Sequence, residues 1–75
     1  MIDKPYVGQR AYFHGLIPFM HKLVVISISC TIAEINPWSI RIVMDRPTKG
    51  YHAFIVYKKD LYLSESDAVL TVLTT

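Results

Sequence analysis

The sequence has one cysteine, three glycines and no long uncharged run. A single cysteine cannot form an intramolecular disulfide, and no cysteine pair stands at the spacing of a zinc site, so we expect a reducing compartment. Lys22 and Glu34 bracket an apolar stretch of only Leu23 to Ala33, well short of the roughly 18 residues of a membrane-spanning helix. We therefore expect a cytoplasmic protein with no membrane association.

Patterns that carry catalysis are missing as well. The glycines stand alone, so they form neither a phosphate-binding loop nor a dinucleotide fingerprint. The carboxylates offer no close pair outside residues 65–67, where a helix start explains them. Cys30 beside one of the three histidines is the remaining arrangement for nucleophilic or metal chemistry. Because Cys30 alternates in phase with Ile28 and Ile32, we favour a buried thiol, and we expect no enzymatic activity, cofactor or metal.

The 75 residues, half of them hydrophobic, fit one domain over residues 1–75. A domain of this size buries roughly 60–65% of its unfolded surface. Its stability is correspondingly small, which favours a partner or self-association. The net charge is +2, and all eight Lys and Arg residues precede Leu61, a distribution that permits a polyanion partner without favouring one.

Alternating polarity predicts strands. Val7, Ala11 and Phe13 share one face of a first strand, and a regular alternation starts again at Ile26. Between them, residues 14–22 follow neither a strand nor a helix period and contain a glycine and a proline. We predict a loop with an apolar tip there, either exposed or folded back over one end of the core.

The stretch Asn36–Ser39, with proline in second place, predicts the turn of a hairpin. A hairpin closed there pairs Ile35 with Ile40 and Glu34 with Arg41. The apolar phase after this turn matches Ala33 and Ile35 rather than the preceding isoleucines. This switch predicts a β-bulge or bend near Ala33.

Residues 46–50 read as a second loop, and Tyr51–Tyr57 as a central strand because both of its faces are apolar or aromatic. Ser64 followed by Asp67 resembles a capping box and predicts a helix from about Glu65. Alternating valines and threonines leave a final strand open for residues 65–75. The helix would present three residues to the sheet: Val69, Leu70 and Leu73.

Three stretches in this order, residues 7–15, 31–45 and 54–68, resemble small SH3-like β-barrels and are similar to compact proteins that phages and other mobile elements encode. The resemblance implies a mainly β fold, a small SH3-like barrel of about five strands with a short C-terminal helix. It also implies a protein that inhibits or modulates a host protein by stoichiometric binding. The acidic loop and paired aromatic residues with which SH3 domains bind proline-rich peptides are missing, so that activity is not implied.

Two sets of side chains are candidate binding surfaces. Large apolar residues at turn tips, with cations at their rim, favour a protein partner: Phe19, Met20, Trp38, Arg46 and Lys49. Interleaved cations and rings suit nucleic acid, the alternative that we rank second: Arg10, Tyr12, Lys49, Tyr51, Lys58 and Lys59. Pairing of an exposed edge strand would also allow a homodimer.

Overall fold

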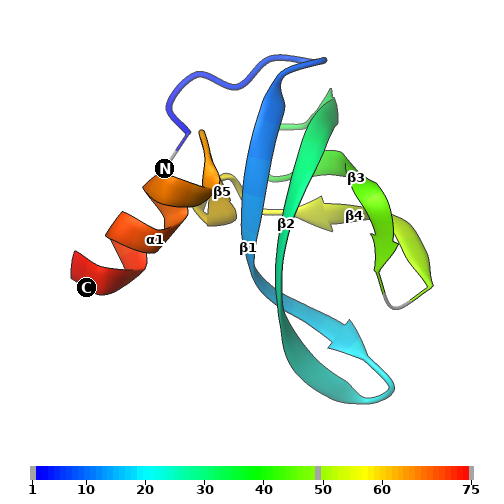
Figure 1. Cartoon of the computed structure of the whole chain (residues 1–75). Coiled ribbons are helices and arrows are strands. Elements are labelled where there is room, and N and C mark those ends of the chain that lie inside the picture. Colours follow the sequence, from blue (N-terminus) through cyan, green and yellow to red (C-terminus); the bar gives the residue numbers. More distant parts are fainter. Residues whose placement is uncertain (1, 49, 75) are drawn as a thin grey trace.

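The computed structural model describes residues 2–48 and 50–74, without the side chains of residues 48 and 71–74. Within them, five antiparallel strands form one sheet in the order β4-β3-β2-β1-β5, and a helix follows the last strand (Figure 1). The mainly β architecture with a C-terminal helix is confirmed. The elements are β1 (Arg10–Phe19), β2 (Lys22–Ile35), β3 (Ile40–Thr48), β4 (Tyr51–Val56), the 3₁₀ helix η1 (Lys58–Asp60), β5 (Leu61–Tyr62) and α1 (Glu65–Thr74).

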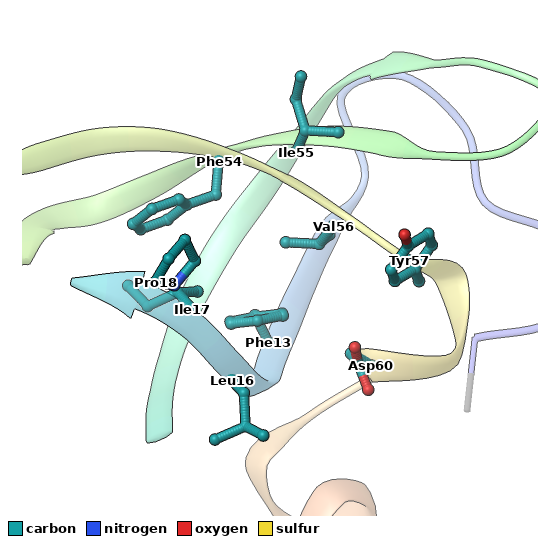
Figure 2. A pocket seen from close by; sticks show the side chains of 9 residues that line it. All are labelled: Phe13, Leu16, Ile17, Pro18, Phe54, Ile55, Val56, Tyr57 and Asp60. Atoms are coloured by element: carbon teal, nitrogen blue, oxygen red, sulfur yellow. The ribbon is translucent and has the colours of Figure 1, made fainter. Parts of the chain in front are cut away.

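The sheet is open, and the barrel closure expected from sequence is not formed by the described strands. β4 lies at one edge of the sheet and β5 at the other. The prediction of a central position for Tyr51–Tyr57 was therefore wrong. One face of β4 is apolar because the sheet bends and directs Phe54 and Val56 toward β1 across a hollow, as Figure 2 shows, whereas Ile55 on the other face is 71% exposed.

The predicted loop over residues 14–22 was also wrong, because those residues form the distal half of a long β1–β2 hairpin. The strands pair without interruption from Arg10 with Thr31 to Phe19 with Lys22. Met20 and His21 turn the chain with φ angles of 49° and 66°. Two successive left-handed residues match the twist of the flanking strands, as in type I′ turns. Neither residue type signals such a turn, which is why sequence patterns missed it.

The second hairpin is confirmed in its details. Ile35 pairs with Ile40 and Glu34 with Arg41, and the register shifts between Ile32 and Glu34, which places the predicted bulge at Ala33. β3 continues to residue 48, so most of the predicted loop 46–50 is strand, and Gly50 lies in a turn. The bulge lets β2 serve both hairpins while its buried face changes phase.

The core lies on one face of the bent sheet. It includes the isoleucines and cysteine of β2 that the alternation predicted, and Ala11 and Phe13 of β1, whereas Val7 is exposed in a turn. Sequence patterns gave no sign of Ile2, which is 1% exposed and whose backbone N–H donates to the carbonyl of Leu61 at 2.9 Å. The main core cluster comprises Ile2, Ala11, Phe13, Ile17, Ile26, Cys30, Ile32, Ile40, Ile42, Val56 and Leu61.

The C-terminal helix begins at Glu65 as predicted, and a final strand over residues 65–74 is ruled out. The Ser64 hydroxyl accepts the backbone N–H of Asp67 at 3.2 Å, and the Asp67 carboxylate accepts the N–H of Leu63 at 3.3 Å. These bonds satisfy donors that a helix start leaves unpaired. The predicted buried face was wrong for Val69 and Leu70, which are exposed.

Ala68 faces the sheet instead, because its small side chain lets α1 pack closely against β1 and β5. It is 2% exposed. The side chain of Leu73, the third predicted contact, lies outside the described residues. The helix therefore covers the β1–β5 side of the sheet and leaves the β1–β2 hairpin uncovered (Figure 1).

Candidate interaction surfaces

An apolar patch covers the exposed face of the distal β1–β2 hairpin. The register places Leu16 directly opposite Val25, and Pro18 directly opposite Leu23. Alternation along each strand puts these four side chains on the same face. Met20 continues the patch at the tip. We call these five residues the hairpin patch: Leu16, Pro18, Met20, Leu23 and Val25. Its four large side chains are exposed, Leu16 by 58%, Met20 by 75%, Leu23 by 68% and Val25 by 63%.

The structure separates the residues that sequence analysis grouped for protein binding. Phe19 ends β1 and Met20 lies at the β1–β2 tip, whereas Trp38, 87% exposed, lies in the β2–β3 turn at the opposite end of β2 (Figure 1). Arg46 is exposed on β3, and Lys49 lies outside the described residues. Tip residues that are distant in space cannot anchor the same small partner surface. Leu16, which lies in the predicted apolar loop, joins Met20 instead, together with Leu23 and Val25 of β2.

A polar row crosses the exposed face of the sheet at the other end of the β1–β2 hairpin from the hairpin patch. Arg10 donates from Nη1 to Thr31 Oγ1 at 2.8 Å and to Asp45 Oδ1 at 2.6 Å, and from Nη2 to Asp45 Oδ2. This bidentate pair holds the pKa of the Asp45 carboxyl below its usual value, chiefly through the hydrogen bonds of Arg10. These hydrogen bonds link β1 to β2 and to β3 on the exposed face of the sheet.

Asp45→Asn is expected to lower the free energy of unfolding at pH 7 and to have no effect in acid. A carboxyl whose pKa is lowered in the folded state contributes stability above its unfolded pKa, and the contribution disappears as the pH falls through the folded pKa. Urea unfolding of the wild type and the variant at pH 7 and at about pH 2 checks this. An equal difference at both pH values would contradict an electrostatic origin.

Four of the six residues of the nucleic-acid alternative make side-chain contacts within the chain, and Lys49 lies outside the described residues. Arg10 holds Asp45, Lys58 donates to the carbonyl of Asp3 at 3.2 Å, and Lys59 lies 5.9 Å from the ring centroid of Tyr57. Tyr12 is half-buried in β1, and Tyr51 packs on Phe54 with ring centroids 4.9 Å apart. A nucleic acid whose phosphates bind these cations would have to compete with the contacts that the cations already make within the chain.

Cys30 lies in the core, as the alternation predicted, with a side chain that is 0% exposed. Burial raises the pKa of its thiol from 9.0 to about 11, and the nearby Asp45 carboxylate adds to the rise. Nucleophilic catalysis needs a thiolate near neutral pH. One histidine, His14, has its Nδ1 2.5 Å from Ser27 Oγ on the other face of the sheet, so it does not serve the thiol.

A hollow of about 200 Å³ lies between the distal part of β1 and β4 (Figure 2). Phe13, Ile17 and Val56 form its floor, and Pro18 approaches Phe54 across it. One end is polar, where Tyr57 and Asp60 stand. The remaining lining residues are Leu16 and Ile55. Gly15 borders this end, and a Cβ there would lie 3.2 Å from Asp60 Cγ and 3.0 Å from the Phe13 ring, so only glycine fits without displacing them.

Among the described residues, no three His, Cys, Asp or Glu side chains gather at a spacing that would hold a metal ion. None of the described helices combines the length and apolar composition needed to cross a bilayer. Comparisons with known protein families, with curated proteins and with solved structures found no match for this chain.

Proposed function

We propose that this chain is a non-enzymatic protein-interaction module that binds one larger protein stoichiometrically through the hairpin patch. The observation that carries the proposal is the set of four large apolar side chains exposed together on the distal β1–β2 hairpin. Contiguous apolar surface on a small domain marks interaction sites, because leaving it in water is unfavourable. A hairpin that projects from the sheet presents this surface to a partner (Figure 1).

The β1–β2 side chains around the hairpin patch are basic or neutral, which indicates the charge of the partner surface that the patch would bind. His21 and Lys22 are exposed at the tip, and residues 11–33 contain no aspartate or glutamate. An apolar groove with acidic residues at its rim would complement the hairpin in both hydrophobicity and charge. The partner in this proposal is therefore a larger protein with such a groove.

The proposal extends to the kind of protein. We propose an SH3-like module, encoded by a phage or another mobile element, that inhibits or modulates a host protein. Its support is the resemblance of the sequence, the small size, the sequential antiparallel pairing of β1 to β4 and the return of β5 to β1. The buried Cys30 with its raised pKa agrees with a role in binding and not in catalysis.

The double variant Leu23→Ser, Val25→Ser is expected to lose more than about fivefold in capture of the protein partner, because central apolar contacts contribute most to binding. Affinity capture from bacterial lysate, with and without nuclease, measures this loss. Leu63→Ser is the matched control, since Leu63 is 62% exposed but lies before α1, away from the hairpin. Circular dichroism of all variants checks the fold.

Equal capture by the double variant and the control would contradict the proposed surface. Loss of all bound material after nuclease treatment would instead favour the nucleic-acid alternative. In that case, binding should also weaken steeply as the salt concentration rises.

A further inference from the structure

Two strand edges without a neighbouring strand face each other across the hollow. β5 pairs with β1 only at Tyr12 and Phe13, so the edge of β1 beyond them has no strand partner there in the described chain. β4 pairs with β3 alone, and its other edge is also unpaired. Figure 2 shows these two edges on either side of the hollow, with side chains from both directed into it. Unpaired backbone N–H and C=O groups at such an edge accept an added strand.

The size of the hollow suits side chains of a peptide. Its volume of about 200 Å³ lies below the roughly 300–1,000 Å³ of small-molecule sites. The floor is formed by buried Phe13, Ile17 and Val56, which offer no hydrogen bond from their side chains to a polar ligand. An extended segment can place one apolar side chain here while its backbone pairs with β4.

The polar end of the hollow favours a positively charged side chain of the bound segment. The half-buried carboxylate of Asp60 has no ion-pair partner among the described residues. The two lysines beside it in η1 are directed elsewhere, Lys58 to the Asp3 carbonyl and Lys59 to the Tyr57 ring. A partner cation at this end would therefore gain a carboxylate with which none of the described lysines and arginines pairs.

We infer that the hollow between β1 and β4 binds an extended segment of the partner protein, which adds a strand to β4. The segment places an apolar side chain against Phe13 and Val56 and a lysine or arginine against Asp60. This inference rests on the proposed function and adds the site at which a linear segment is recognised.

Charge complementarity favours a partner protein over a second copy of this chain. The strand that a second copy would add at this edge is β4 itself, and β4, Tyr51–Val56, contains no lysine or arginine. The β4 residues of a second copy would therefore bring no cation to Asp60. The homodimer predicted from edge-strand pairing is therefore an outcome that the test distinguishes.

The test uses the full chain and a random twelve-residue peptide library. Selected peptides are expected to share alternating apolar residues and one lysine or arginine. Asp60→Asn should weaken their binding by up to about fivefold, the range of a partly exposed ion pair. Asp3→Asn is the matched control, because Asp3 takes part in its contact with Lys58 through the backbone carbonyl. Backbone amide shifts on titration should change at Phe54–Tyr57 and at Leu16 and Ile17.

Four results would overturn the inference. The first three are that the selected peptides lack a basic residue, that they bind Asp60→Asn unchanged, and that no peptide is selected, in which case light scattering shows whether the free chain is instead a dimer. Peptides that move the amides of Leu23 and Val25 but not those of β4 would overturn it too. That last result would leave the protein-interaction function intact, whereas equal lysate capture by the hairpin double variant and the Leu63→Ser control would contradict the proposed function alone.

Discussion

Phe13→Ala is expected to unfold much of the protein at 25 °C. Phe13 is 1% exposed and pairs with Ile28 of β2 on one side and with Leu61 of β5 on the other. Truncating a buried phenylalanine removes about 3–5 kcal/mol. A chain of 75 residues has a total stability of roughly 4–11 kcal/mol on the usual scale per residue. The loss therefore consumes a large share of the stability.

Urea unfolding followed by circular dichroism measures this effect. Leu23→Ala is the matched control, because Leu23 is 68% exposed and its truncation should change the free energy of unfolding by less than about 0.5 kcal/mol. An unfolding midpoint of Phe13→Ala close to that of the control would contradict the described core. Such a result would mean that the ring does not pack between β2 and β5.

Alkylation of Cys30 in the folded protein is expected to be at least about a hundredfold slower than in the unfolded chain at pH 8. A pKa raised from 9.0 to about 11 reduces the thiolate fraction by about two powers of ten. The fully buried side chain slows the reaction further because the reagent cannot reach the sulfur. The desolvation that raises the pKa is thus also what protects the thiol.

Mass spectrometry after timed exposure to iodoacetamide, with and without urea, measures the two rates. Because the folded-state pKa is the raised one, burial of the neutral thiol contributes stability below about pH 9, and this contribution is lost as the pH rises toward 11. Rapid alkylation of the folded protein near pH 7 would reopen the catalytic interpretation of Cys30. Cys30→Ala gives the background.

Sequence patterns predicted the parts of the fold that local chemistry determines. The turn at Asn36–Ser39 has the residues that such a turn requires, and opposite charges at Glu34 and Arg41 confirm its register. The helix start at Glu65 is likewise encoded by Ser64 and Asp67. In both cases the deciding contacts join residues that are close in sequence.

Predictions failed where long-range packing overrides local preference. Gly15 and Pro18 indicate a loop, yet both lie in β1, because Gly15 makes room for Phe13 and Asp60 and Pro18 lies at a strand edge that needs no donor. The candidate site shared this error. Leu23 and Val25 were not predicted as site residues, and only the continuous pairing of β1 with β2 reveals that they share an exposed face with Leu16 and Pro18.

The return of β5 to β1 has a consequence for the order in which the chain assembles. β1 to β4 pair with their neighbours in sequence, so these hairpins form by closing short loops. Tyr12 and Tyr62 lie about fifty positions apart, and closing a loop of that length costs roughly 3 kcal/mol of chain entropy. A two-residue strand cannot offset this alone, and the burial of Ile2, Leu61 and Ala68 must accompany it. We therefore expect the β1–β5 pairing to form after the hairpins of β1 to β4 during folding.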